Sequence, residues 1–248
     1  DWVWALGRRA KGHDLGFAPY SGALGALMTR PDSGIDSLCD LAGRSVGVVG
    51  GALDKSWLVY EALAAKDCGF GLDGSTQALF GAPPLMSREL ETGGVDAVST
   101  YWHYAARLEA AGMREVIDVV GALDRLGIRP APPLVGFVWD RGRSEPDTVA
   151  AFLHSVRAAG AVLATDDAAW DRVRPLMRAE ADASFARLVS AYRAGIPDGW
   201  DEADTEAAAA LYRTLGETGG DAFARGAGEW DPALFDAPDP AVLPGDDG

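Results

Sequence analysis

Short apolar runs alternate with helical patterns in the first half of the chain. The apolar run at 46–49 has the length of a buried strand, Gly50 and Gly51 end it, and a helical pattern opens at Asp54. Further strands are predicted at 79–80, 95–99, 116–120 and 134–139, and further helices at 83–92 and 101–112. Strands that alternate with helices are typical of an α/β domain.

The second half of the chain has a helical pattern only. Apolar residues recur at helical spacing between 149 and 163, and similar patterns cover 167–178, 182–194 and 202–218. The segment from Asp231 onward is rich in proline and acidic residues, and we expect it to be extended and partly disordered beyond about Val242.

Composition and charge exclude several classes of protein. Lys and Arg number 22 against 37 Asp and Glu, which gives a formal charge of −15, and 48% of the residues are hydrophobic. That hydrophobic share excludes a disordered chain, and the 248 residues suffice for two lobes with separate cores. The acidity argues against a nucleic-acid-binding domain. No uninterrupted apolar run approaches the ~18 residues of a membrane span, so the chain reads as soluble.

The two cysteines leave two interpretations open. Cys39 and Cys68 are too few for a disulfide-dense scaffold or a four-thiolate zinc site. They either form one bridge in an exported protein or are two separate buried thiols.

Residue patterns for catalysis are sparse. The glycines between 47 and 51 lack the dinucleotide-binding spacing, and no Walker A sequence is present. His13, His103 and His154 lie far apart in the sequence, which makes a zinc site improbable. The sequence therefore predicts no catalytic residue, no metal and no cofactor.

Aromatic and polar side chains gather in four segments, each predicted to follow a strand. These segments are 1–2, 19–21, 51–57 and 101–104. Ligands of open α/β sheets bind beyond the carboxyl ends of strands. Asp54 either contacts a ligand at a helix N-terminus or simply caps that helix. In 101–104, at most two of the four amphipathic side chains can share one buried face, so the others line a cleft or the surface.

Two sequence motifs resemble a known family. The run Ile-Asp-Ser-Leu-Cys-Asp-Leu-Ala-Gly-Arg-Ser-Val-Gly-Val at 35–48 and the run Leu-Glu-Thr-Gly-Gly-Val-Asp-Ala-Val at 90–98 resemble signatures of type II periplasmic solute-binding proteins of ABC importers. The nearest group is the nitrate/sulfonate/taurine and thiamine-pyrimidine branch, which includes the SsuA-like proteins. The resemblance runs from Asp1 to about Glu217.

The resemblance implies two α/β lobes joined by a hinge, with a ligand held in the cleft between them. Lobe one would comprise 1–33 and 141–248, and lobe two 34–140. Trp2, Tyr20, Trp102 and Trp57 would stack on the ligand, and Ser21 and Ser56 would hydrogen-bond it. The implied ligand contacts are Asp1, Trp2, Tyr20, Ser21, Gly51, Leu53, Asp54, Lys55, Ser56, Trp57, Tyr101, Trp102 and His103.

The resemblance also implies a function and partners. The chain would capture a small organic solute in the periplasm or at the cell surface and deliver it to an ABC permease and ATPase. Because Asp1 and Asp54 are acidic, a neutral or cationic heterocycle is favoured over a sulfonate or nitrate. Lys55 either binds a carboxylate or sulfonate or points to water.

Two alternatives to a transport component share the fold. One is an enzyme, similar to a thiamine-pyrimidine synthase or a small-acid dehydratase, with His103 near the cleft. The isolated Cys39 and Cys68 lack the cysteine-rich segment that the synthases need. The other is a sensory domain that signals to a partner.

The start of the chain departs from the family pattern. Family members carry a strand–helix–strand unit and a signal or lipoprotein peptide before the position of Asp1. We therefore expect an N-terminal truncation that removes the first part of lobe one. In the alternative, the C-terminal helices cover the gap.

Overall fold

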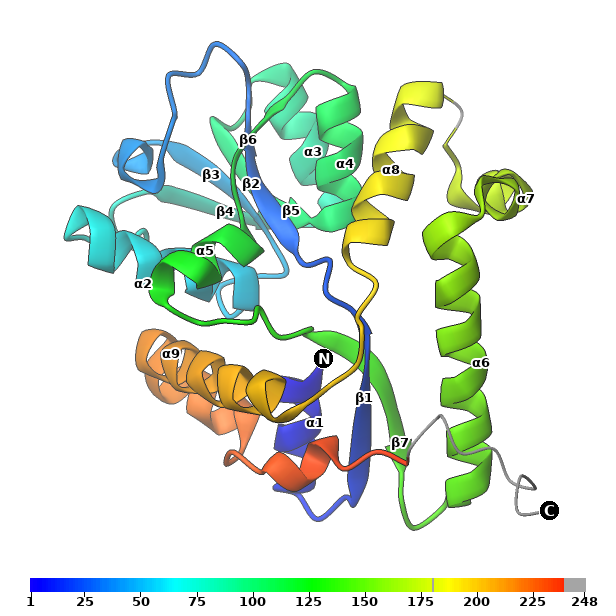
Figure 1. The fold of residues 1–248 in the computed structure, drawn as a ribbon. Helices are drawn as coiled ribbons and strands as arrows, with labels where there is room; N and C mark the ends of the chain where they lie inside the picture. The colour runs from blue at the N-terminus through cyan, green and yellow to red at the C-terminus, as the bar shows by residue number, and fades with distance from the viewer. Residues whose placement is uncertain (180, 239–248) are drawn as a thin grey trace.

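Two β-sheets organise the molecule into an upper and a lower lobe (Figure 1). The computed structural model describes residues 1–179 and 181–238. The upper lobe holds five strands in the order β4-β3-β5-β2-β6, and the lower lobe holds the pair β1-β7. This mixed α/β architecture, with two lobes, confirms the predicted fold class.

The upper sheet is parallel on one side and antiparallel on the other. Its strands are β2 (Gly25–Thr29), β3 (Ser45–Val49), β4 (Gln77–Gly81), β5 (Ala97–Tyr101) and β6 (Arg114–Asp118). β3 pairs in parallel with β4 and β5, whereas β2 runs antiparallel to β5 and β6. Its four helices are α2 (Lys55–Cys68), α3 (Pro83–Thr92), α4 (Trp102–Ala110) and α5 (Val119–Leu126). Helices α2 and α5 share one core cluster with the sheet, and α3 and α4 share another.

The lower lobe is built around an aromatic core. It comprises α1 (Trp2–Arg9), β1 (Leu15–Ser21), β7 (Val135–Asp140), α9 (Glu202–Ala227) and the 3-10 turn η2 (Pro232–Phe235). The Trp2 ring meets Trp230 and Phe235 edge-on, and Trp200 stacks on Phe235 at 4.3 Å. Such ring pairs stabilise a core beyond the area that they bury.

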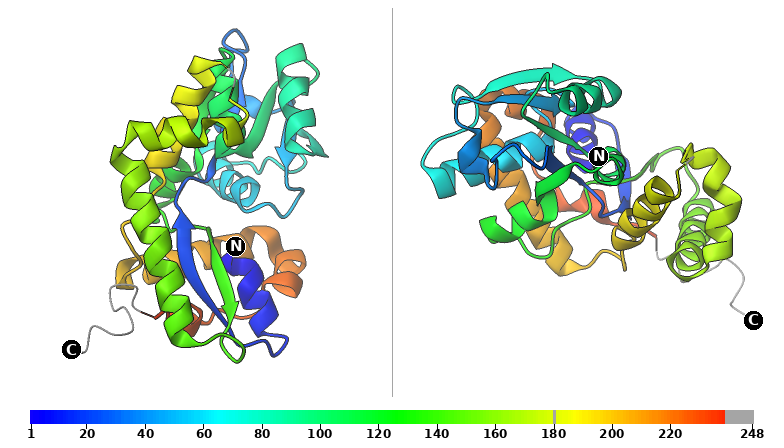
Figure 2. Two further views of the ribbon diagram at one scale, coloured as in Figure 1. Left: turned by 90° about the vertical axis from the view of Figure 1, so that its right-hand side faces the viewer. Right: turned by 90° about the horizontal axis from the view of Figure 1, so that it is seen from above.

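Three helices form an arm beside both lobes (Figure 2). They are α6 (Pro146–Thr165), α7 (Asp167–Met177) and α8 (Asp182–Ala194). α6 packs its Val149 and Leu153 on Ala18 of β1, and α8 packs against α4 of the upper lobe. The arm therefore contacts both lobes.

The lobe boundary differs from the expected one. β2 lies in the upper sheet, although the sequence placed 1–33 in lobe one, and β7 lies in the lower sheet, although it falls within 34–140. The physical reason is pairing, because β2 lies between β5 and β6, and β7 forms an antiparallel ladder with β1. The first crossing between the lobes is at residues 22–24.

Two local predictions are wrong. The apolar run at 116–120 continues as a strand only to Asp118, whose carboxylate accepts a hydrogen bond from the amide of Gly121 at 2.7 Å and caps α5. After Asp231 the chain is not simply an extended tail, because Leu234 and Phe235 of η2 are buried. The disorder expected beyond Val242 concerns residues outside the described ones.

The structure resolves the alternative for the cysteines. Cys39 and Cys68 form a disulfide, with their Cα atoms 5.3 Å apart. The bridge ties the short turn η1 (Leu38–Leu41) to the last residue of α2.

Helix α6 meets the length and composition criteria for a membrane span. Its mean hydropathy is 1.3, and 17% of the tested window is buried. Asp147 and Arg157 interrupt its apolar residues, so α6 contains no uninterrupted apolar run of that length. Core helices of soluble proteins share this length and composition, and α6 forms one wall of a cavity.

Asp96 joins two strands of the upper sheet through charge-assisted hydrogen bonds. Its carboxylate accepts from the backbone amide of Ser45 at 2.9 Å and from the Ser45 hydroxyl at 2.8 Å. These bonds, together with Arg44 and Arg30, hold the pKa of Asp96 below its usual value. A carboxyl whose pKa is lower in the folded state stabilises the protein above its unfolded pKa.

We expect Asp96→Asn to lower the free energy of unfolding by about 1.5 kcal/mol at pH 7. The difference from the parent should shrink as the pH falls below about 4, because Asp96 of the unfolded parent then takes up a proton, and it should vanish below the lowered pKa of the folded state. Urea unfolding at several pH values measures it. A difference that stays constant down to pH 3 would contradict the assignment.

Candidate functional site

Three helices begin at one edge of the upper sheet, facing the lower lobe (Figure 1). β3, β4 and β5 run in parallel, so their carboxyl ends lie at the same edge. α3 and α4 follow their strands directly at Ala82 and Tyr101, and α2 follows a short glycine turn at Asp54. The partial positive charges of three helix N-termini meet at this edge. Few of their first N–H groups are free, because Asp54 caps α2, Pro83 and Pro84 begin α3, and the amide of Trp102 donates to the carbonyl of Leu24.

Asp54 caps α2 from inside this edge. Its carboxylate accepts hydrogen bonds from the amides of Ser56 at 3.0 Å and Trp57 at 3.3 Å. Burial raises the pKa of Asp54, while these bonds and Lys55 oppose the rise. The cap interpretation is therefore confirmed, and the contact with a ligand stays a prediction.

One ion pair crosses from the upper lobe to the lower lobe. The Lys55 ammonium, in the first turn of α2, lies 2.9 Å from the carboxylate of Asp1, which caps α1. Both side chains are about three-quarters buried, with 26% and 25% exposed. Burial lowers the pKa of Lys55, and Asp54 opposes this. Because Lys55 is paired, it does not point free into water.

The local charge at this edge is negative. Asp1 and Asp54 supply two carboxylates against the ammonium of Lys55, and burial and then Lys55 lower the pKa of the Asp1 α-amino group, which favours its neutral form. Burial, and then the charge of Asp54, raise the pKa of the Tyr101 phenol, so the hydroxyl keeps its proton and remains a donor. Burial and Arg107 lower the pKa of His103, which favours a neutral imidazole.

Two of the predicted stacking residues belong to the core instead. Trp2 is fully buried, and its indole N–H donates to the carbonyl of Pro133 at 3.1 Å. Trp57 is 3% exposed in the core cluster where α2 meets α9. Tryptophan is as suited to a core as to a cleft, and the sequence could not separate the two roles.

Three other predicted contacts have local roles or lie at the surface. The Ser21 hydroxyl accepts a hydrogen bond from the amide of Ala23 at 3.1 Å and is nearly buried. Gly51 has φ +95°, and its carbonyl accepts from the amide of Asp54, so a glycine is needed for this turn. Leu53 is 41% exposed at the same turn.

Aromatic rings form a chain from this edge to the lower lobe. The Tyr101 ring stacks with His103 at 6.3 Å, and Trp102 meets His103 at 5.4 Å. Tyr192 of α8 follows, 6.2 Å from Trp102 and 6.4 Å from Tyr20. The Tyr20 and Tyr192 hydroxyls are 3.2 Å apart, and burial and then this bond raise the pKa of Tyr192.

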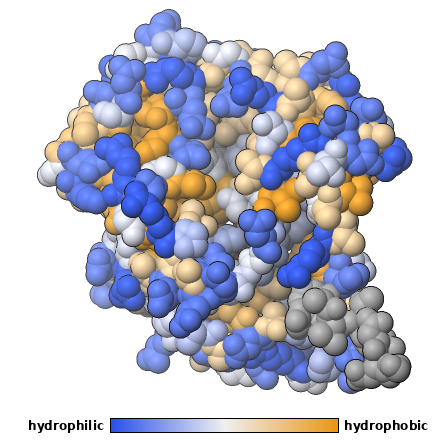
Figure 3. Space-filling model, viewed as in Figure 1, coloured by the Kyte–Doolittle hydropathy of each residue, from blue (hydrophilic) through white to orange (hydrophobic). Residues whose placement is uncertain are grey.

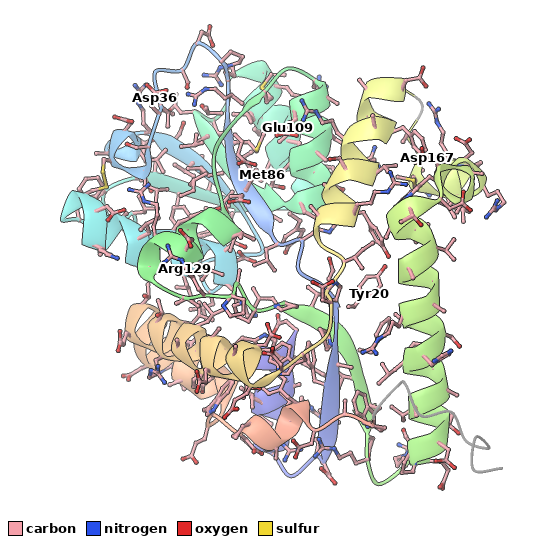
Figure 4. All side chains as sticks on the ribbon, in the orientation of Figure 1. Tyr20, Asp36, Met86, Glu109, Arg129 and Asp167 are labelled. Carbon is pink, nitrogen blue, oxygen red and sulfur yellow. A yellow bond between two sulfur atoms is a disulfide. The ribbon has the colours of Figure 1, made fainter. Side chains whose placement is uncertain are left out.

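The chain of rings ends at a cavity of about 560 Å³ between β1, α6 and residues 196–200. Tyr20 lines it, and Figure 4 shows this residue at the upper end of β1. Phe17, Trp200 and Phe235 contribute further rings. Asp1, Asp54 and Tyr101 do not line this cavity, so the predicted contacts divide between two places.

Sequence reasoning missed several residues at both places. Phe80, 51% exposed, is the residue before the last one of β4, close to the start of α3, and the rule about carboxyl ends of strands would have found it. Tyr192, Trp200 and Arg157 reach the cavity from distant parts of the chain. No sequence signal links them to Tyr20.

Ser45 occupies a spacing that some hydrolases use for their nucleophile. Residues 43–47 read Gly-Arg-Ser-Val-Gly, which matches Gly-x-Ser-x-Gly. Ser45 begins β3, and its hydroxyl donates to Asp96, whereas a nucleophile elbow lies at the turn from a strand into a helix. No group of three or more potential metal ligands is present among residues 1–179 and 181–238.

Comparisons with solved structures give the fold. The sulfonate-binding protein SsuA of Xanthomonas axonopodis, bound to MOPS, matches with a TM-score of 0.63 at 16% identity, over 85% of this chain and 72% of that one. A putative sulfonate-binding SsuA of Methylobacillus flagellatus matches with 0.63 at 18%, over 93% and 68%. The chain has the fold of the SsuA-type solute-binding proteins. The SsuA of Escherichia coli matches with 0.53 at 19% identity, over 85% of this chain and 66% of that one.

The SsuA-type fold confirms the resemblance read from the two motifs. No protein-family model matches the chain, and no curated protein matches it. The Lys55–Asp1 pair lies between the lobe of the five-stranded sheet and the lobe of the β1-β7 pair.

Proposed function

We propose that the chain is the solute-binding component of an ABC import system and holds a small organic solute between its lobes. The observation that carries this proposal is the edge where α2, α3 and α4 begin, joined to the lower lobe by the Lys55–Asp1 pair. The SsuA proteins with this fold are named for sulfonate binding, and the ligand component of Staphylococcus aureus with this fold belongs to an ABC-type import system. A permease and an ATPase would be the partners, and the periplasm or cell surface the location.

The solute is a neutral or cationic heterocycle. The local excess of carboxylate over ammonium disfavours a free anion and stabilises a positive charge. The Tyr101 hydroxyl would hydrogen-bond the solute, and His103 would stack on it. Closure would follow from a higher affinity of the solute for the closed arrangement of the lobes.

A thermal-shift panel on the full chain tests the proposal. The panel holds thiamine precursors, polyamines, taurine, alkyl sulfonates and nitrate. At about 100 times its dissociation constant, a ligand adds about 2.7 kcal/mol of stability. A shift by a heterocycle or a cation without turnover supports the proposal, a shift by sulfonates alone overturns the ligand class, and consumption of a compound overturns the carrier role.

Asp54→Asn separates the charge at this edge from helix capping, because asparagine caps a helix as well as aspartate. We expect a cationic ligand to bind about tenfold more weakly, which is about 1.4 kcal/mol, with the melting temperature of the free protein nearly unchanged. Asp166→Asn is the matched control, since Asp166 caps α7 in the arm. Equal affinity in the parent and Asp54→Asn would show that the carboxylate does not face the ligand.

A further inference from the structure

The cavity between β1, α6 and residues 196–200 has the dimensions of a small-molecule site. Its volume of about 560 Å³ falls within the roughly 300–1,000 Å³ that is usual for ligand pockets. It is separate from the edge described above, which Asp54 and Lys55 occupy. In Figure 3 the surface is hollowed, with apolar side chains exposed, between the arm and the rest of the molecule.

The walls are flat and apolar. Phe17, Tyr192, Trp200 and Phe235 present rings, and Leu153 and Ile196 add aliphatic surface. Trp200 and Phe235 are stacked on each other, which fixes the position of both rings. A planar apolar group would find ring faces and edges already in place, so little conformational entropy would be lost on binding.

Two charged side chains of opposite sign also line the cavity. Arg157 extends from α6, and Asp198 belongs to the loop after α8. Neither side chain has an ion-pair or hydrogen-bond partner among residues 1–179 and 181–238. The loop is close to the helix, since a Cβ on Gly160, one turn after Arg157, would lie 3.7 Å from Ile196.

We propose that this cavity binds a compact zwitterion with a flat apolar body, such as an aromatic amino acid. The guanidinium of Arg157 would bind the carboxylate through parallel N–H bonds, and Asp198 would accept from the ammonium group. The rings would enclose the apolar body. This site is a second one, and it does not depend on the solute site near Asp54.

Titration calorimetry with the full chain tests the charge pattern. The probes are L-tryptophan, indole-3-propionate, which lacks the ammonium group, and tryptamine, which lacks the carboxylate. We expect L-tryptophan to bind at least tenfold more tightly than either analogue. In Arg157→Gln, L-tryptophan should no longer bind more tightly than tryptamine. In Asp198→Asn, it should no longer bind more tightly than indole-3-propionate.

Filling the cavity tests its position. Gly160 lies in the helix α6 with room for a side chain toward Ile196, so Gly160→Leu should weaken all three probes at least tenfold. Gly216→Leu is the matched control, because Gly216 lies in α9 with no atom within 4 Å of its Cβ position. Asp54→Asn should leave tryptophan binding unchanged.

Three results would overturn the second site. They are the absence of binding heat for every probe with the parent chain, equal affinities for the three probes, or an undiminished affinity in Gly160→Leu. Loss of tryptophan binding in Asp54→Asn would show that tryptophan binds at the edge near Asp54. This result would overturn the second site and leave the solute-binding proposal unaffected. If no compound of the solute panel bound while tryptophan still bound, the solute-binding proposal would fail and the second site would stand.

Discussion

Trp2→Ala should lower the free energy of unfolding by about 3–5 kcal/mol, because it removes a large side chain from a closed core. Trp2 is fully buried, and its ring contacts those of Trp230 and Phe235. The substitution also leaves the carbonyl of Pro133 without the indole N–H. Urea unfolding followed by far-ultraviolet circular dichroism measures the loss.

Trp2→Phe is the matched variant. It keeps a ring in the core and loses the hydrogen bond to Pro133 and part of the buried area, so we expect less than half of the loss seen with alanine. If Trp2→Ala unfolded at nearly the same urea concentration as the parent and instead lost solute binding, Trp2 would be a ligand contact, as the family resemblance implied.

The sequence predicted elements best where their ends are marked chemically. Helix α3 matches its predicted range at both ends, because Pro83 and Pro84 begin it and Gly93, with φ +82°, ends it. Val119 and Val120 are β-branched, so the predicted strand extended past Asp118. In the structure Asp118 caps α5, and the cap overrides the strand propensity of the two valines. A local capping hydrogen bond, from the amide of Gly121 to the Asp118 carboxylate, thus decided the end of the strand.

The candidate site was predictable only where its residues are close in sequence. The turn from Gly51 to Lys55 and the residues after β5 follow strands, and a rule about strand ends located them. The partner of Lys55 could not be read from the sequence, since Asp1 approaches from the other lobe. Tyr20 was expected at the same ligand as Asp54, but it faces a cavity whose other walls come from α6 and residues 196–200.

The two proposed sites differ in their net charge. The edge near Asp54 has an excess of carboxylates, whereas the cavity presents one arginine and one aspartate without partners. A chain with a net charge of −15 repels anions from a distance, so an anionic group would need a specific cation close by. Arg157 meets this requirement in the cavity, and Lys55 does not, because Asp1 neutralises it.

Removal of the disulfide should destabilise the chain by about 3–4 kcal/mol. The bridge closes a loop with a sequence separation of 29 residues, and its loss frees that loop in the unfolded state. The double variant Cys39→Ser/Cys68→Ser avoids a free thiol, and differential scanning calorimetry under oxidising conditions measures the change. At about 2–4 °C per kcal/mol, the midpoint should fall by roughly 6–16 °C.

Reduction of the parent chain provides the control for this prediction. With a thiol reductant present, the parent should melt close to the double variant, and the variant itself should not respond to the reductant. Because the bridge lies in the upper lobe at the end of α2 away from Asp54, ligand affinity at 25 °C should be unchanged in the double variant. Equal midpoints for the oxidised parent and the double variant would mean that the loop is already ordered without the bridge.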